Sequence, residues 1–265
     1  MRRERKLVGL VGHGAIGREV HAILCGAFDF AVLLRPGSAS RPVLEGAGAA
    51  VVTCLEDLLA LGPDIAVEAA GAEVLETVSG PILEAGCDLV PASTGGLGDA
   101  AHLARLVATA TRSGARILVP AGAIGGLDYL SALPEGEPFE VLYTSRKPPA
   151  AWRQELERLG HACGAPSDAV TLFEGGPQEG ARLYPRNLNA GLTVALAVGP
   201  GRTRVRVVAD PSVAENTHEI TVESALGTAF FRFANKPSSS NPKTSAITGH
   251  SIAAVVRRRF STIVT

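Results

Sequence analysis

The strongest constraint on this chain is a glycine-rich hexapeptide that separates an apolar run from a helical pattern. The apolar run is Leu7–Val11, the helical pattern is Ile16–Leu24, and between them stands Gly12-His13-Gly14-Ala15-Ile16-Gly17. Glycines spaced as GxGxxG between a strand and a helix are typical of dinucleotide-binding turns. The first glycine permits the tight turn, the second lets the backbone approach a pyrophosphate, and the third lets helix pack on strand. We therefore expect this turn to bind a dinucleotide through Gly12, Gly14, Ala15, Ile16 and Gly17, the alternative being a glycine turn without a ligand.

Up to residue 120 the chain alternates short apolar strands with helical stretches. After Leu7–Val11, strands are expected at Phe30–Leu34, Ala49–Thr53, Ile65–Glu68, Asp88–Pro91 and Ile117–Pro120. Helices are expected between them, at Ile16–Leu24, Val43–Ala50, Leu55–Leu61, Val74–Ala85 and Ala100–Ser113. Strands separated by such helices form a parallel sheet that is covered on both faces, which is why its strands are mainly apolar. The pattern predicts an α/β fold with a doubly wound nucleotide-binding sheet.

After about Ala123 the pattern becomes that of an α+β domain with a mainly antiparallel sheet. Strands are expected at Phe139–Arg146, Ala169–Glu174, Thr203–Ala209, His218–Ser224 and Thr228–Ala234, with helices at Arg186–Val198 and Ser245–Arg258. Short turns between the last three strands predict an antiparallel meander. We predict a dinucleotide-binding (Rossmann) domain at residues 1–122 and 246–265. A domain for substrate binding and dimerisation is expected at 123–245, with the active site in the cleft between the two.

Composition and charge exclude several classes of protein. The formal net charge is −1, so no basic field is present to hold nucleic acid. No apolar run reaches the roughly 18 residues of a membrane span, and Leu7–Val11 is too short for an export signal. The four cysteines are widely spaced, which predicts reduced thiols in the cytoplasm and no metal site.

A series of motifs in the second half is more specific than the glycine turn. In chain order these motifs are Ala121–Asp128, Tyr143–Pro149 with Trp152, Phe173–Gly175, Tyr184–Asn189, Ala209–Pro211, Glu215–His218 and Asn241–Ser245. The series resembles the bacterial and archaeal L-aspartate dehydrogenases, and the resemblance covers nearly the whole chain. One departure lies at Gly191-Leu192-Thr193, where Ala-Ala-Thr is common in the family.

The resemblance implies an enzyme activity, a cofactor and site residues. L-aspartate would be oxidised at its CH–NH2 group to iminoaspartate by hydride transfer to NAD or NADP. The imine would then hydrolyse to oxaloacetate and ammonia, or feed NAD biosynthesis. His218 matches the family's active-site histidine, and Ala123 and Asn189 match its cofactor-contacting positions. The resemblance also implies a homodimer, and the exposed edge of an open sheet favours such pairing.

The residues themselves support two assignments. Hydride leaves Cα readily only when the amine is neutral, so a group of near-neutral pKa must accept a proton, which suits histidine. Of six histidines, His218 alone lies where a polar loop meets a strand, although a single histidine there is often structural.

Arg35 stands near the end of the second strand, where an NAD enzyme usually carries an acid. With Ser38 and Arg41 nearby it predicts a site for the 2′-phosphate of NADP, and a plain surface residue is the alternative.

A dicarboxylate substrate needs cations or converging N–H donors. Lys243 and Thr244 are candidates, because Thr244 and Ser245 would cap the following helix and leave its N-terminus free for an anion. Capping alone is the alternative.

Two other functions stay open for the chain. One is a related two-domain enzyme, homoserine dehydrogenase-like or dihydrodipicolinate reductase-like, and the other is a non-catalytic NAD(H)-sensing protein.

Overall fold

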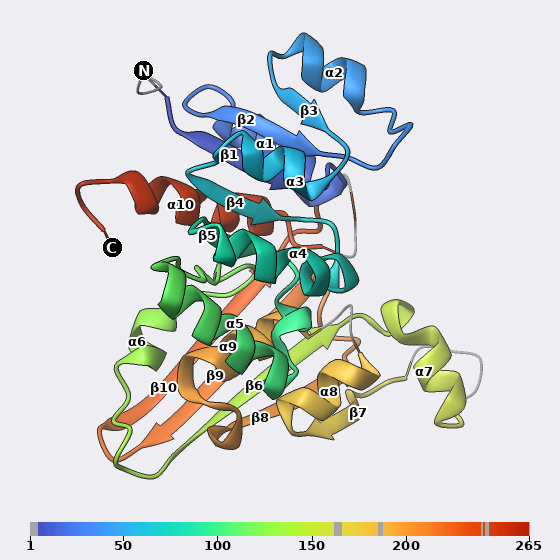
Figure 1. Cartoon of the computed structure of the whole chain (residues 1–265). Helices are drawn as coiled ribbons and strands as arrows, with labels where there is room; N and C mark the ends of the chain where they lie inside the picture. Colours follow the sequence, from blue (N-terminus) through green and yellow to red (C-terminus); the bar gives the residue numbers. More distant parts are fainter. Residues whose placement is uncertain (1–4, 162–165, 185–187, 240, 242–243, 265) are drawn as a thin grey trace. The chain divides into compact units, whose positions relative to one another are not determined.

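The computed structural model describes residues 5–161, 166–184, 188–239, 241 and 244–264. The chain divides into two compact units, one made of Met1–Pro120 with Thr248–Thr265 and the other of Ala121–Ile247. Each unit contains one five-stranded sheet (Figure 1). The second unit is therefore an insertion between the two segments that form the first. The predicted fold class, a parallel nucleotide-binding sheet plus an α+β domain, is confirmed.

The first unit has a parallel sheet in the strand order β3-β2-β1-β4-β5. Its strands are β1 (Leu7–Val11), β2 (Asp29–Leu33), β3 (Ala50–Val52), β4 (Ile65–Glu68) and β5 (Asp88–Pro91). Its helices are α1 (Ala15–Leu24), α2 (Arg41–Gly46), α3 (Leu55–Ala60), α4 (Ala72–Glu84), α5 (Ala100–Ser113) and α10 (Ile247–Phe260). The strand order reverses between β1 and β4, and sheets of this class bind ligands at such a switch point.

The elements predicted for this unit are present with small shifts, apart from the last strand. The helix expected at Ala100–Ser113 has the same bounds in the structure. Asp99 caps its start by accepting a hydrogen bond from His102 N at 2.6 Å, and Gly114 ends it with a φ of 75°. The sixth strand expected at 117–120 is wrong, because within the described residues only Ile117 pairs, in an isolated parallel bridge with Leu89.

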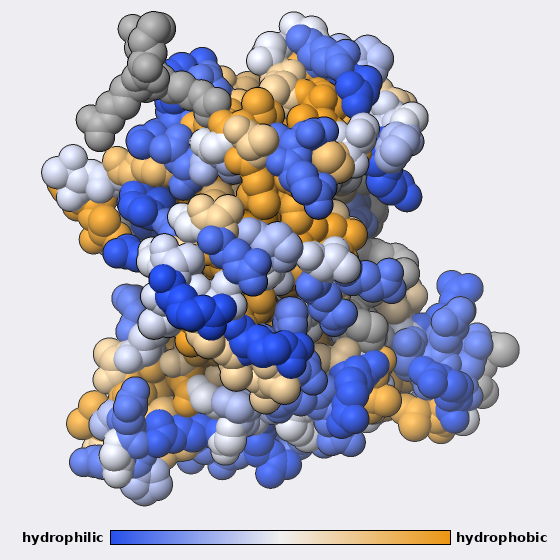
Figure 2. All heavy atoms as spheres, viewed as in Figure 1, coloured by the Kyte–Doolittle hydropathy of each residue, from blue (hydrophilic) through white to orange (hydrophobic). Residues whose placement is uncertain are grey.

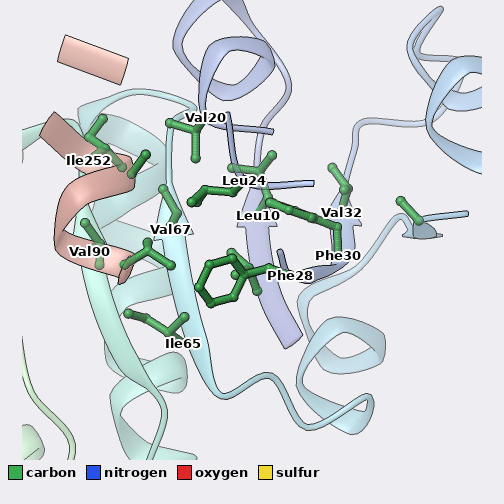
Figure 3. Close-up of a cluster of buried hydrophobic side chains, with 14 of the residues drawn as sticks. Leu10, Val20, Leu24, Phe28, Phe30, Val32, Ile65, Val67, Val90 and Ile252 are labelled. Atoms are coloured by element: carbon green, nitrogen blue, oxygen red, sulfur yellow. The ribbon is translucent and has the colours of Figure 1, made fainter. Parts of the chain in front are cut away.

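The core of the first unit includes side chains from the sheet, from α1 and from α10. Its buried members include Val8, Leu10, Val20, Leu24, Phe30, Ile65, Val67, Val90, Ile252 and Val256. Figure 3 shows Ile252 of α10 in the same cluster as Val67 and Val90 of the sheet. α10 also approaches α1 closely, since a Cβ placed on Gly249 would lie 2.9 Å from the Cβ of Glu19. The last helix of the chain thus completes a core that begins at β1.

The second unit has a mixed sheet in the order β10-β9-β6-β8-β7. Its strands are β6 (Phe139–Lys147), β7 (Val170–Gly175), β8 (Thr203–Ala209), β9 (Asn216–Ser224) and β10 (Gly227–Asn235). The pairs are antiparallel except β6 with β8, which is parallel. The predicted meander is therefore wrong in one respect, because β6 lies between β8 and β9. The middle of β6 is buried on both faces from Tyr143 to Ser145, as a central strand requires.

Four α-helices lie in the second unit within the described residues. They are α6 (Leu127–Ser131), α7 (Arg153–Arg158), α8 (Pro177–Leu183) and α9 (Asn189–Val198). The first three have five to seven residues, too few for a helical period to show in the sequence. The helix expected from Arg186 begins at Asn189 in the described part, and residues 185–187 lie outside it. Val194 and Val198 of α9 pack in one core with Val205 and Val207 of β8.

The surface seen in Figure 2 mixes hydrophilic residues with smaller groups of apolar ones on each unit. Among the helices that the structure describes, none is both long enough and apolar enough to cross a membrane.

Candidate active site

The glycine turn joins β1 to α1 at the carboxyl end of the parallel sheet. Gly12 has a φ of +88°, and a Cβ there would lie 2.8 Å from the Cβ of Ala70. A Cβ on Gly17 would lie 2.3 Å from the carbonyl oxygen of Gly12. Both positions therefore require glycine for the fold itself, the first for the turn and the second for the approach of the helix to the turn.

Gly14 differs from the other two glycines of the motif. It is exposed, its φ of −75° is open to any residue, and a Cβ there would meet no atom within 4 Å. It occupies the N-cap of α1, where no side chain provides a capping hydrogen bond. Free backbone N–H groups at such a helix start attract phosphate. The space in front of Gly14, Ala15 and Ile16 thus has the shape and polarity that a pyrophosphate needs.

Arg35 lies beside this turn, just beyond the end of β2. β1 and β2 pair in parallel up to Val11 and Leu33, and Gly12 N donates to Leu33 O at 3.1 Å. Arg35 is exposed, and its carbonyl accepts a hydrogen bond from Ser38 N. Arg41 instead pairs with Glu45 at 2.9 Å on α2. The position of Arg35 allows contact with a ligand that extends from the glycine turn along the end of β2.

Glu68, at the end of β4, was not predicted as a site residue. Its buried carboxylate accepts hydrogen bonds from Ala70 N at 2.7 Å, Gly71 N at 2.8 Å and Ser93 N and Oγ, each at 3.1 Å. Burial raises the pKa of Glu68, and these hydrogen bonds oppose the rise. Glu68 thus fixes the loop on which Gly12 packs. An acid that ends an otherwise apolar strand was the sequence signal for it.

His218 lies on β9 in the second unit, on the sheet face that packs into the core. Its Nδ1 is 2.7 Å from the hydroxyl oxygen of Tyr143, which stands on the neighbouring strand β6. Residue His218 is 6% exposed, and its Nε2 has no hydrogen-bond partner within the described part of the chain. One ring nitrogen is therefore held in place by the protein, and the other is left for a further partner.

The electrostatics of this position favour a neutral imidazole. Burial, and secondly the positive charge of Lys147, lower the pKa of His218 from 6.5 to about 4. Burial also raises the pKa of Tyr143, so this phenol stays protonated. At neutral pH His218 is thus an uncharged group. It can accept a proton at Nε2 if Nδ1 carries the ring hydrogen and donates it to Tyr143.

Tyr143 is fixed from its other side by α9. A Cβ on Gly191 would lie 3.0 Å from Cδ1 and 3.2 Å from Cε1 of the Tyr143 ring. Gly191, which departs from the family's Ala-Ala-Thr, therefore leaves room for the ring of Tyr143. The hydroxyl of that ring bonds His218.

Ala123 and Asn189, the two positions implied to contact the cofactor, both connect to the His218 region. Ala123 O accepts a hydrogen bond from Asn235 Nδ2 at 2.7 Å. Asn235 ends β10, the strand on which Phe233 pairs with His218. Asn189 is exposed and begins α9, the helix that packs on Tyr143 through Gly191. Ala123, Asn189 and His218 are therefore connected through Asn235, β10 and the Gly191–Tyr143 contact of α9.

The predicted substrate-binding pair is placed only in part, because Lys243 lies outside the described residues. Thr244 accepts a hydrogen bond from Asn241 Nδ2 at 3.1 Å, and its carbonyl accepts one from Ser238 N at 2.7 Å. α10 begins at Ile247, so the expectation that Thr244 and Ser245 cap it is wrong. Ser245 is buried and bridges to Pro237 instead. Within the described residues, no group of three or more His, Cys, Asp or Glu side chains could hold a metal ion.

The two units match models of known domain families. Residues 12–120 match the NAD-binding domain of homoserine dehydrogenase, and residues 128–259 match the C-terminal domain of aspartate dehydrogenase. L-aspartate dehydrogenase 2 of Bordetella pertussis is 44% identical over 259 residues, which cover 96% of this chain and 97% of that protein. The L-aspartate dehydrogenase of Ruegeria pomeroyi is 38% identical over 264 residues, 98% of this chain and 94% of that one.

A solved structure agrees with these relatives. The crystal structure of aspartate dehydrogenase from Thermotoga maritima superposes with a TM-score of 0.77 at 26% identity, covering 99% of this chain and 100% of that one. The resemblance drawn from the motifs of the second half is thereby confirmed. With a parallel nucleotide-binding sheet, a buried histidine on a mixed sheet and full-length relatives of one kind, the chain belongs to the L-aspartate dehydrogenase family.

Proposed function

We propose that this protein is an NAD(P)-dependent L-aspartate dehydrogenase. It oxidises the CH–NH2 group of L-aspartate to iminoaspartate, which hydrolyses to oxaloacetate and ammonia or feeds NAD biosynthesis. The observation that carries the proposal is His218, an imidazole kept neutral by burial in a chain of this family. Such a group suits a reaction whose substrate must lose a proton from nitrogen before hydride can leave carbon.

The residues present fit a dinucleotide cofactor, NAD or NADP. Gly12 and Gly17 shape the turn, and the open space at Gly14 leaves the helix start free for phosphate oxygens. Arg35 is the candidate for the 2′-phosphate of NADP, and Ala123 and Asn189 are the candidates in the second unit. When bound, the nicotinamide supplies the hydride acceptor. The placing of the active site between the two domains stays a prediction.

His218 is proposed to take the proton that the substrate amine releases. L-aspartate arrives as an ammonium ion, and loss of one proton to Nε2 leaves a neutral amine whose lone pair assists departure of hydride from Cα. The product is the iminium form of iminoaspartate, so one proton and one hydride leave the substrate. Tyr143 holds Nδ1 at 2.7 Å and thereby directs Nε2 to this task. His218 is 6% exposed, so burial shields the ring from solvent.

Absorbance at 340 nm tests the proposal, because NADH and NADPH absorb there and their oxidised forms do not. L-aspartate with NAD⁺ or NADP⁺ should raise the absorbance, and oxaloacetate with ammonia and reduced cofactor should lower it. L-homoserine serves as the comparison substrate. A response to homoserine alone would favour the related two-domain dehydrogenases, and nucleotide binding without any turnover would favour a sensor.

We also propose a homodimer that uses the outer face of the second sheet. This face carries Leu142 and Phe230, the latter 61% exposed, among charges of both signs such as the Arg206–Glu174 pair at 2.8 Å. A surface that mixes charges with apolar side chains can complement a second copy of itself. Light scattering at micromolar concentration should give about twice the chain mass of 27.3 kDa. A monomer would count against the proposal, and Phe230→Glu should weaken the dimer.

The proposed compartment is the cytoplasm. Cys25, Cys54 and Cys87 are free cysteines, as expected where thiols are kept reduced.

A further inference from the structure

Three polar side chains lie together on the sheet face that packs into the core of the second unit. Tyr143 and Ser145 stand two residues apart on β6, and Ser145 pairs directly with His218 of β9 in the strand register. Because side chains alternate between the faces of a strand, all three share one face. The exposed fractions of Tyr143, Ser145 and His218 are 0%, 0% and 6%, so each polar atom depends on a protein or ligand partner.

These side chains form a series of hydrogen bonds that ends at the imidazole. The hydroxyl oxygen of Tyr143 is 2.7 Å from Nδ1 of His218, and the same hydroxyl is hydrogen-bonded to the side chain of Ser145. In the described part of the protein these two groups are the hydrogen-bond partners of the Tyr143 side chain. A hydroxyl has one hydrogen to donate and lone pairs with which to accept. The hydrogen of Tyr143 is therefore donated either to Nδ1 or to Oγ of Ser145.

The direction of this series decides which ring nitrogen of His218 carries the hydrogen. If Ser145 donates to Tyr143 and Tyr143 donates to Nδ1, the neutral ring carries its hydrogen on Nε2 and has no lone pair there. If Nδ1 donates to Tyr143 and Tyr143 donates to Ser145, Nε2 keeps its lone pair. Only the second arrangement lets Nε2 accept a proton.

The surroundings of Nε2 favour the second arrangement. Nε2 is buried, and among the described residues it has no hydrogen-bond partner. A hydrogen on Nε2 would therefore be a buried donor without an acceptor, which is costly. A hydrogen on Nδ1 has the oxygen of Tyr143 as its acceptor, provided that the hydrogen of Tyr143 points elsewhere. Ser145 is the partner that takes it.

We propose that Ser145 is a positioning residue that accepts the hydrogen of Tyr143, keeps the hydrogen of His218 on Nδ1 and so leaves Nε2 as the base. Its use in catalysis rests on the proposed dehydrogenase function. When the substrate ammonium transfers one proton to Nε2, the ring becomes an imidazolium whose Nδ1–H still donates to Tyr143. No O–H bond of Tyr143 or Ser145 breaks in this step, so both hydroxyls stay neutral.

Ser145→Ala tests this assignment, because it removes the acceptor and only one heavy atom. Ser79→Ala is the matched control, since Ser79 is also 0% exposed but lies on α4 in the first unit. Each protein is prepared with isotopically labelled histidine. Proton–nitrogen correlation spectra then show which ring nitrogen of His218 is protonated, at neutral pH, where a pKa of about 4 keeps the ring uncharged. The signal missing from His218→Asn identifies this ring, and fluorescence of the buried Trp152 reports that the second unit is folded.

The hydrogen of His218 is expected on Nδ1 in the wild type and in Ser79→Ala. In Ser145→Ala the hydroxyl of Tyr143 has only Nδ1 as an acceptor, so the ring hydrogen should move to Nε2. The kcat with aspartate should then fall about 10- to 100-fold, as for one buried polar group left without its partner, while NADH binding stays at the wild-type value. A ring that keeps its hydrogen on Nδ1 in Ser145→Ala, or carries it on Nε2 in the wild type, would overturn the proposal.

A Tyr143→Phe background separates this role from simple packing. Ser145 acts through the hydroxyl of Tyr143, so once that hydroxyl is gone, Ser145→Ala should change kcat less than about twofold. An equal fall with and without the Tyr143 hydroxyl would contradict the assignment, because Ser145 would then only fill space. If the wild type does not oxidise aspartate at all, the proposed function fails. The spectra of wild type and Ser145→Ala would still decide whether Ser145 sets the position of the ring hydrogen.

Discussion

His218→Asn tests whether the buried imidazole is neutral, as a proton acceptor must be. The folded protein lowers the pKa of His218 from 6.5 to about 4, first through burial and then through the charge of Lys147. In the unfolded chain the same ring binds its proton near pH 6.5. Between pH 6.5 and 4 the unfolded state therefore holds more protons than the folded state, so the free energy of unfolding falls as the pH is lowered through this window.

The size of the effect follows from the two pKa values. The shift from 6.5 to about 4 corresponds to a loss of about 3 kcal/mol at pH 4 and about 2 kcal/mol at pH 5, with little at pH 7. Asparagine does not titrate, so the variant should lack this component of the acid sensitivity. The pKa values of His13 and His21 are also lowered by burial, but these rings titrate in both proteins. The difference between wild type and variant therefore isolates His218.

Urea unfolding followed by tryptophan fluorescence at pH 7 and pH 5 measures this difference. The chain has one tryptophan, Trp152, which is buried in the unit that contains His218, so the signal reports that unit. From pH 7 to pH 5 the wild type should lose about 2 kcal/mol more than the variant. Turnover with aspartate at neutral pH should fall about 100- to 10,000-fold in the variant, or about 3 to 5 kcal/mol on the barrier. Equal acid sensitivity of the two proteins, or near wild-type turnover, would refute the reasoning.

Four further substitutions test the cofactor site and the support of Tyr143. Arg35→Ala should raise the KM for NADP⁺ and leave that for NAD⁺ nearly unchanged, and equal effects in steady-state assays would end the 2′-phosphate assignment. Gly14→Ala should keep wild-type thermal stability, because a Cβ there meets nothing within 4 Å, and yet weaken NADH binding about tenfold or more. Gly17→Ala should instead lower the melting temperature, because its Cβ would lie too close to a backbone oxygen. A loss of thermal stability in Gly14→Ala with unchanged NADH binding would exclude a phosphate site at Gly14. Gly191→Ala should gain about 1 kcal/mol of helix propensity but lose about 1–3 kcal/mol through crowding of Tyr143. Its net effect in urea unfolding should be a small loss of stability with reduced turnover, and wild-type turnover would show that the ring adjusts freely.

The parallel domain was the more predictable part of the fold. Its strands are mainly apolar because the sheet is covered on both faces, and the same apolar residues mark the strands in the sequence. The mixed sheet was less predictable, because pairing partners far apart in the chain leave no local signature. Thus β8 and β9 were expected to be neighbours, although β6 lies between them.

The candidate site shows the same division between local and distant information. The glycine turn is one continuous segment, and the role expected for each of its glycines follows from spacing alone. Lys147 and Tyr143 belong to the motif Tyr143–Pro149, but no local pattern in the sequence places them beside His218. The period of two along β6 places them on one face, yet only the β6–β9 register shows that this face is the one that carries His218.

The position of α10 has a consequence for how the protein is made. Leu10 and Val20 are synthesised before the second unit, but Ile252 and Val256, which belong to the same core, are synthesised after it. The whole second unit must be synthesised before the first can bury its apolar surface. We therefore expect the nascent first unit to need protection from aggregation until α10 has been synthesised. A stop codon just before Thr248 should leave the second unit complete and still abolish nucleotide binding, although every glycine of the cofactor turn would be intact.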